Sequence, residues 1–246
     1  MRLHRIILPL LLSATACADT ITVAVASNFS VAASGLVVRF EQLTGHHVRV
    51  ATASTGLLYA QASNGAPFSA FLAADADRPR LLQESGVGIA GSRFTYAIGR
   101  LVLWSADPAL GGADCRDQLD NLERMRLAIA NPLTAPYGEA AKQFLMRADI
   151  WDDTEDNLVY GENIAQTFQF VATRNANMGL IAASQLIGDR VPATACEWTV
   201  PDSMHEPIEQ QAILLDETDA ARAFLEFLAS SEGRAIIRAH GYEVPD

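Results

Sequence analysis

The sequence predicts an α/β fold in which mostly parallel sheets are flanked by helices and divided between two lobes. From Ile21 onward, short apolar segments typical of strands alternate with segments of helical spacing, and this alternation indicates parallel sheets covered by helices. Residues 220–240 are helical with no strand after them, so they should pack back on the first half of the chain. The chain would then cross between the lobes twice, near residues 94–99 and near residues 203–210.

The first half of the chain begins with a clear strand and helix. Residues 21–26 form an apolar, strand-like run that ends at Ser27-Asn28. Apolar residues then recur at i, i+3, i+4 and i+7 over residues 29–43, which predicts a helix that Gly45 stops. Two further strands, each followed by a short helix, are expected over residues 47–51, 57–62, 70–74 and 80–84.

The second half repeats this pattern after a long strand-like stretch over residues 94–104, interrupted at Gly99. Strands are expected over residues 126–130 and 157–160, and each leads into a helix. A last strand over residues 209–215 precedes the terminal helices, which should break near Ser230-Ser231. From these patterns we place domain I at residues 19–97 and 207–246, and domain II at residues 98–206.

Four strand–helix junctions carry small or hydrogen-bonding residues where a helix starts. They lie at Ser27-Asn28, at Ser54-Thr55-Gly56, over residues 131–138 and over residues 161–163. A helix N-terminus has unpaired N–H groups and the positive end of the helix dipole. Several such termini directed at one place would form an anion site. Taken singly, the polar residues could also be simple helix caps.

The first eighteen residues have the features of a secretory signal peptide. A basic start is followed by an apolar stretch over residues 6–12, which is too short to span a bilayer. Small residues at positions 14–18 then fit a cleavage site, which we place after Ala18. The alternative is a lipoprotein with Cys17 lipidated, although Ala14 stands where such sites usually have leucine. The signal peptide predicts a periplasmic protein.

The net charge argues against some classes of partner. The chain carries a formal charge of −11, and removal of residues 1–18 with two arginines would give −11 − 2 = −13. Nucleic acid and anionic membrane surfaces are therefore excluded as expected partners. After removal of Cys17, Cys115 and Cys196 remain. Such a pair in an exported protein suggests a disulfide, and two separate buried thiols are the alternative.

Ordered motifs run through nearly all of residues 19–246. They include VAVASNF at 23–29, ASTG at 53–56, NGAPF at 64–68, GSRFTYAIG at 91–99 and APYG at 135–138. Together they resemble the periplasmic molybdate-binding proteins, the solute receptors of molybdate ABC importers. The resemblance implies a two-lobed periplasmic binding protein fold of type II, with two hinge crossings, that closes over one tetrahedral oxyanion. Many relatives have Asp at the position of Ser69, Ser at that of Ala73 and Ser at that of Thr55.

The resemblance also implies a function and a set of ligand residues. The protein would capture molybdate, or tungstate of similar size and charge, and deliver it to the membrane permease of an ABC importer. We expect a monomer with no cofactor, no catalytic activity and no metal beyond that of the bound ion. Five residues match the family's ligand positions, the last of them through its backbone N–H: Ser27, Asn28, Thr55, Tyr137 and Ile164.

These residue types suit a molybdate ion, which at neutral pH has four oxygens and no proton to donate. Hydroxyl and backbone N–H groups supply the donors that such an ion needs. Lysine and arginine are absent from residues 27–28, 54–56 and 132–138, so helix dipoles and uncharged donors would have to bind the charge. Each residue also has a structural alternative: Tyr137 as a packed aromatic and Ile164 as an ordinary core residue.

Three other functions remain as alternatives. The first is a receptor for another tetrahedral oxyanion, namely sulfate, thiosulfate or phosphate. The second is an enzyme on the same scaffold, which would need an acid/base pair; Glu139 and Glu162 are the candidates beside the predicted site, and we expect both to point outward. The third is a sensory domain that reports the ion. The sequence has no G-x-S-x-G, P-loop or H-E-x-x-H motif.

Overall fold

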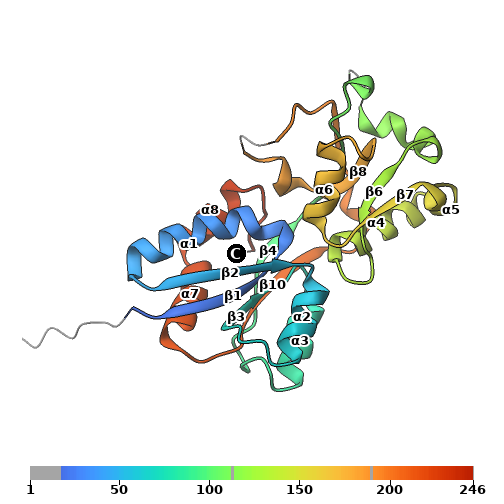
Figure 1. Ribbon diagram of the computed structural model, residues 1–246. Helices are drawn as coiled ribbons and strands as arrows, with labels where there is room; N and C mark the ends of the chain where they lie inside the picture. The colour runs from blue at the N-terminus through green and yellow to red at the C-terminus, as the bar shows by residue number, and fades with distance from the viewer. Residues whose placement is uncertain (1–17, 112–113, 189–190, 246) are drawn as a thin grey trace, which may run out of the picture.

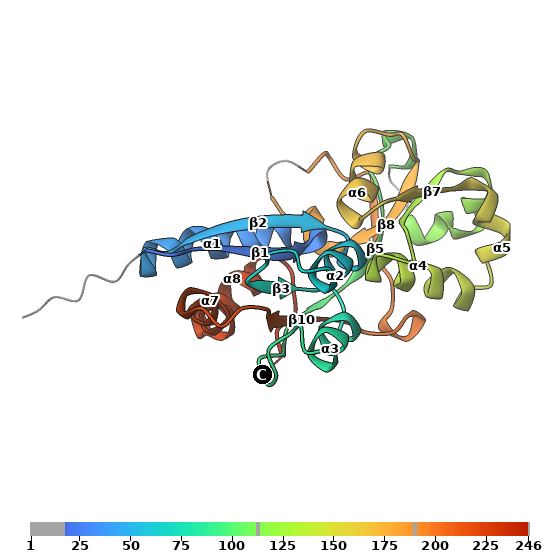
Figure 2. The same cartoon turned by 60° about the horizontal axis from the view of Figure 1, so that its bottom comes forward.

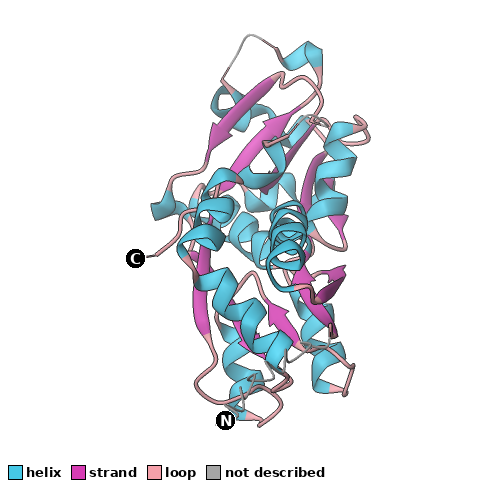
Figure 3. Ribbon diagram, turned by 90° about the vertical axis from the view of Figure 1, so that its left-hand side faces the viewer, coloured by secondary structure: helices cyan, strands magenta, loops and turns pink. Residues whose placement is uncertain are grey.

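The computed structural model describes residues 18–111, 114–188 and 191–245 and contains two lobes, each built on a five-stranded sheet (Figure 1). Helices cover the strands in both lobes, as Figure 3 shows by colour. The predicted two-lobed α/β fold is therefore confirmed. The predicted signal peptide lies outside the described residues except for Ala18. Within the described ranges, no helix is both long and apolar enough to cross a membrane.

The sheet of the first lobe has the strand order β2-β1-β3-β10-β4. These strands are β1 (Thr20–Ala26), β2 (His47–Ala53), β3 (Ala70–Leu72), β4 (Phe94–Gly99) and β10 (Ile208–Leu214). β1 is parallel to β2 and β3, whereas β10 is antiparallel to β3 and β4. Four of the five strands therefore share one direction, as expected for a mostly parallel sheet.

Different helices bury the two faces of this sheet. On one face lie α1 (Ser30–Thr44), α7 (Asp219–Ala229) and α8 (Ser231–Ala239), which share a core with Val23 and Val25 of β1. On the other face lie α2 (Thr55–Ser63) and α3 (Asp77–Glu84), which share a core with Ala24. Successive side chains of a strand point to opposite faces. The terminal helices contact α1, so they pack on the first half as predicted (Figure 2).

The sheet of the second lobe has the order β7-β6-β8-β5-β9. Its strands are β5 (Leu101–Ser105), β6 (Leu127–Ala130), β7 (Leu158–Gly161), β8 (Met178–Ala182) and β9 (Cys196–Thr199). β6 is parallel to β7 and β8, and β5 is antiparallel to β8 and β9. This sheet is thus also mostly parallel, with one strand reversed.

Helices flank this second sheet as well. α4 (Pro136–Arg147) contributes Phe144 and Leu145 to one core, and α6 (Ile164–Ala172) contributes Val171 to the other. α5 (Trp151–Thr154) follows α4. Short 3-10 helices complete the described chain: η1 (Ser27–Phe29), η2 (Pro108–Leu110), η3 (Cys115–Arg124), η4 (Glu155–Asn157), η5 (Ala183–Leu186) and η6 (Asp202–Met204).

The chain passes between the two sheets at two places. Only Arg100 separates β4 from β5, and η6 lies between β9 and β10. The long strand expected over residues 94–104 is therefore two strands in different sheets, divided beside Gly99. β4 extends two residues beyond the domain limit that we placed at residue 97. The exact division into residues 19–97 with 207–246 and residues 98–206 stays a prediction.

A disulfide joins Cys115 in η3 to Cys196 at the start of β9. Of the two interpretations of this cysteine pair, the structure thus has the disulfide. Both cysteines are buried in the core of the second lobe. The bond ties the long connection between β5 and β6 to the edge strand β9, and it does not link the two lobes.

Candidate functional site

A small pocket lies between the lobes, where helix starts from both of them meet. The first lobe lines it with Ala26, Ser27, Asn28, Ser54, Thr55 and Ala74. The second lobe lines it with Ala135, Pro136, Tyr137 and Ile164. The structure therefore brings all five predicted ligand residues together around one space, and it adds Ser54, which lies beside a predicted residue.

Ser27 and Asn28 form the short helix η1 between β1 and α1. The N-cap positions of η1 and α1 are Ala26 and Phe29, so Ser27 and Asn28 are not the cap residues of these helices. The side-chain amide of Asn28 donates to Gln210 Oε1 at 2.8 Å and to the Tyr242 hydroxyl at 3.1 Å. Both amide hydrogens are thereby used. Asn28 can still offer the pocket its backbone N–H, because it lies at a helix start.

Thr55 begins α2 and is almost completely buried, at 1% exposure. Its Oγ1 accepts a hydrogen bond from the backbone N–H of Ala74 at 3.2 Å. A hydroxyl group has one hydrogen of its own, so Thr55 can accept from Ala74 and still donate into the pocket. Ser54 is the N-cap residue of this helix but makes no side-chain cap bond to the residues described. Its hydroxyl is thus a further donor at the pocket wall.

Tyr137 reaches the pocket from the first turn of α4. Pro136 precedes it at the first helical position, where a missing N–H costs nothing. Gln210 donates from Nε2 to the Tyr137 hydroxyl oxygen at 3.3 Å. Burial raises the pKa of Tyr137 well above its usual value, and the nearby Tyr242 adds to the rise. Tyr137 therefore stays protonated at physiological pH and keeps a hydrogen to donate.

Ile164 starts α6 and contributes through its backbone. The cap residue Asn163 accepts from the N–H groups of Ala165 and Gln166 at 3.0 and 3.1 Å. This cap therefore serves the second and third residues of the helix and does not use the N–H of Ile164. The side chain of Ile164 is buried in the core of the second lobe. The two interpretations of Ile164, as a core residue and as a backbone donor, are thus compatible.

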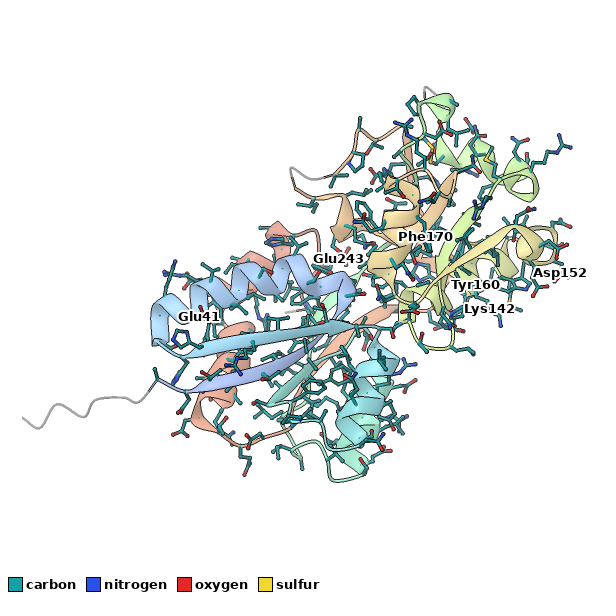
Figure 4. The ribbon with its side chains drawn as sticks, in the orientation of Figure 1. Glu41, Lys142, Asp152, Tyr160, Phe170 and Glu243 are labelled. Carbon is teal, nitrogen blue, oxygen red and sulfur yellow. A yellow bond between two sulfur atoms is a disulfide. The ribbon has the colours of Figure 1, made fainter. Side chains whose placement is uncertain are left out.

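Among the described residues that line the pocket, none carries a charge. Glu139 and Glu162 are both exposed and do not line it. Glu139 borders a separate and larger groove between the lobes, with Asp75 and Arg78 on the opposite side. Asp152 and Glu41, which are labelled in Figure 4, lie on the outside of the lobes. An acid/base pair in the pocket is therefore not formed by the two residues that the enzyme hypothesis needs.

Contacts between the lobes close the pocket. The backbone N–H of Gly56 in α2 donates to the carbonyl of Thr134 at 2.8 Å. Arg78 donates to the carbonyl of Leu133 at 3.3 Å, and its guanidinium also pairs with Asp75. These bonds join the first lobe to the loop before α4. The lobes are therefore in a closed arrangement, with donors from both facing the same space.

The sequence did not single out the polar residues behind the pocket. Gln210 is completely buried in β10, and Tyr242 and Tyr96 are buried beside it. The available signal was a polar pair, Gln210-Gln211, which together with Glu209 interrupts a strand whose other residues are apolar. A buried polar group needs hydrogen-bond partners, and such a pair therefore marks a hydrogen-bonded network even where it does not reveal which residues form it.

Comparisons with known proteins agree with this architecture. Residues 21–243 match the family model of bacterial extracellular solute-binding proteins. The molybdate-binding protein ModA of Azotobacter vinelandii is 44% identical over 94% of this chain and 93% of its own length. ModA of Rhodobacter capsulatus is 42% identical over 94% of this chain and 91% of its own.

A solved structure is also similar over nearly the whole chain. The periplasmic molybdate-binding protein of Azotobacter vinelandii superposes with a TM-score of 0.85 and 35% identity, covering 92% of this chain and 100% of that one. Identities above 40% over more than nine-tenths of both chains show common descent as well as a common fold. The chain therefore belongs to the ModA family within the bacterial extracellular solute-binding proteins.

Proposed function

We propose that this protein captures molybdate, and tungstate of similar size and charge, in the pocket between the lobes. Its ligand residues would be Ser27, Asn28, Thr55, Tyr137 and Ile164. One observation carries the proposal: uncharged donors from both lobes converge on one small pocket between the lobes. The names of the relatives, which are molybdate-binding proteins, support the choice of ion.

The physical chemistry of the pocket favours an anion without protons. The hydroxyls of Ser27, Thr55 and Tyr137 and helix-start N–H groups can all donate. Hydrogen bonds to a charged acceptor contribute about 1.5–3 kcal/mol each. Five of them would contribute roughly 8–15 kcal/mol before the cost of association, enough for a micromolar or tighter Kd. Because both lobes supply donors, the ion would favour the closed form.

Membership of the ModA family supports a cellular role for the protein. The protein would act in the periplasm after removal of a signal peptide, as a monomer without a cofactor. It would hand its ion to the membrane permease of an ABC importer, and it would have no catalytic activity. Lysine and arginine are absent from the part of the pocket lining that the structure describes, and this would help release, because no opposite charge holds the ion.

A panel of oxyanions measured by thermal shift tests this proposal. A ligand that binds only the folded state raises its stability by mass action, so molybdate and tungstate should raise the melting temperature more than sulfate, thiosulfate or phosphate. Calorimetry should then give tighter binding for molybdate than for sulfate at each pH. A preference for sulfate or phosphate would overturn the ligand assignment.

A pair of variants tests the site itself. Thr55→Ala removes a hydroxyl that lines the pocket and should weaken molybdate binding by about tenfold or more. Glu162→Gln is the matched control, because Glu162 is exposed beside the same site but does not line it. Binding should be unchanged in this control. Equal loss in both variants, or none in Thr55→Ala, would contradict the assignment.

A further inference from the structure

Four side chains form a continuous hydrogen-bonded row behind the pocket, which we call the relay: Tyr242, Asn28, Gln210 and Tyr137. The Tyr242 hydroxyl donates to the backbone carbonyl of Asn28 at 2.8 Å. Asn28 Nδ2 donates to the Tyr242 oxygen at 3.1 Å and to Gln210 Oε1 at 2.8 Å. Gln210 Nε2 donates to the Tyr137 oxygen at 3.3 Å. The relay thus links the C-terminal segment, both lobes and the pocket wall.

The donor and the acceptor of each hydrogen bond in the relay can be assigned in turn, starting from Tyr242. The backbone carbonyl of Asn28 can only accept, so Tyr242 must donate its single hydroxyl hydrogen to it. The Tyr242 oxygen is then left as an acceptor, so the Asn28 atom that lies 3.1 Å from it must be the donor Nδ2. The Ser184 hydroxyl is a second donor to this oxygen. Asn28 Nδ2 can only donate, so the atom of Gln210 that faces it must be the acceptor Oε1.

The orientation of Gln210 in turn decides what Tyr137 does. With Oε1 bound by Asn28, Nε2 faces Tyr137 and donates to its oxygen. Tyr96 has one hydroxyl hydrogen for two acceptors, the Ala73 carbonyl at 3.1 Å and Gln210 Oε1 at 3.2 Å; its donation to Oε1 agrees with this orientation. Tyr137 therefore cannot give its hydrogen to Gln210. That hydrogen is left to donate into the pocket.

We propose that Gln210 is a positioning residue that makes Tyr137 a hydrogen-bond donor to the bound ion, and that the relay thereby selects a tetrahedral anion carrying no proton. This inference rests on the proposed function of the pocket. Gln210 does not line the pocket, so it acts through Tyr137. A reversed amide would accept the tyrosine hydrogen and turn the oxygen of Tyr137 toward the ion, which suits a ligand that donates a proton.

A double-mutant cycle measured with molybdate tests this coupling. Tyr137→Phe should weaken binding by about tenfold or more, the value of a hydrogen bond to a charged group. Gln210→Leu should cause a similar loss in the wild-type background and a loss below about twofold in the Tyr137→Phe background, because the group it positions is then absent. Melting curves without the ion report any loss of folding.

The outcomes separate the two proposals. If the wild type binds molybdate but Tyr137→Phe binds equally well, the proposed site is wrong and the inference falls with it. If Tyr137→Phe weakens binding while Gln210→Leu lowers molybdate affinity equally in both backgrounds, the proposed binding site is supported and only the role of the relay is overturned.

A second variant keeps the test open if Gln210→Leu does not fold. Gln210→Glu keeps the shape and the Oε1 acceptor, but its ionised carboxylate would accept from Tyr137. Burial raises the pKa of such a carboxyl toward neutrality, and Tyr96 and Tyr137, which contact this position, keep their protons well above pH 10. Molybdate affinity of this variant should fall by about tenfold or more from pH 6 to 9. In the Gln210→Glu, Tyr137→Phe double variant, molybdate affinity should fall less over this pH range than in Gln210→Glu alone. An equal fall in both variants would overturn the proposed role of the relay.

Discussion

The hydroxyl end of Tyr137 lies against Gly99, in the space that a Cβ at position 99 would fill. Such a Cβ would also lie 2.8 Å from Tyr137 Cζ and 2.9 Å from Gln210 Nε2. Gly99 ends β4, one residue before the chain crosses into the second lobe. The crossing point and the pocket wall are therefore in direct contact, and only glycine leaves room for both.

Gly99→Ala should weaken molybdate binding. The new methyl group must push Tyr137 or Gln210 away, since distances below about 3 Å are not tolerated, and a displaced hydroxyl no longer donates to the ion. We expect a loss of about tenfold or more by calorimetry. Gly35→Ala in α1 is the control, because its Cβ would meet neighbours at 3.5 Å or more and alanine favours a helix. Unchanged affinity in Gly99→Ala would show that the contact can relax.

Gly56→Ala should oppose closure of the lobes. Its Cβ would lie 3.0 Å from both Cα and the carbonyl oxygen of Thr134 in the second lobe, whereas alanine is well suited to the start of α2 itself. The variant should therefore fold normally without ion. With molybdate it should bind more weakly, release the ion faster and contract less in small-angle X-ray scattering. Full contraction with wild-type affinity would mean that the Gly56–Thr134 contact does not limit closure.

The sequence predicted much of this fold because the apolar period and the helix-stop residues are local signals. The break at Ser230-Ser231 is one example: α7 ends at Ala229, and Ser230 accepts from the N–H of Gly233 to cap α8. The five predicted ligand residues came from the family resemblance, and the structure places them around one pocket.

Other features depend on contacts that no local pattern encodes. The reversed strands β5 and β10 follow from the crossings between lobes, because a strand that enters a sheet from the other lobe is not joined to its neighbours by a helix. The role of the Asn28 side chain is a second case. Its amide donates to Gln210 and Tyr242, which are 182 and 214 residues away in sequence, so the sequence alone could not show that both amide hydrogens are used behind the pocket.

Loss of the Cys115–Cys196 disulfide should lower stability without changing the affinity for molybdate. The bond closes a loop with a sequence separation of 81 residues, and a disulfide across such a loop contributes about 2–5 kcal/mol to the free energy of unfolding. A Cys115→Ser, Cys196→Ser variant should therefore unfold at lower denaturant concentration. Because both cysteines lie within the second lobe and neither lines the pocket, Kd should stay the same. A large change in Kd would mean that the bond also shapes the site.

High pH should lower the free energy of unfolding, because the buried tyrosines behind the pocket have raised pKa values. Burial is the main cause that raises the pKa of Tyr96, Tyr137 and Tyr242 above the usual value of 10.0. The folded state therefore holds these protons more tightly than the unfolded state. Their contribution to stability is complete below pH 10 and is lost as the pH rises from there toward the folded-state pKa values.

Each such tyrosine costs about 1.4 kcal/mol of unfolding free energy per pH unit in that range. Urea titrations from pH 7 to 11 should show that the contribution of these tyrosines to the free energy of unfolding is constant up to about pH 10 and falls steeply above it. The Tyr242→Phe variant removes one of the three groups and should fall less steeply. Molybdate affinity should stay constant up to about pH 10, because Tyr137 must be protonated to donate. A decline in affinity that begins below pH 9 would mean that a group other than these tyrosines controls the site.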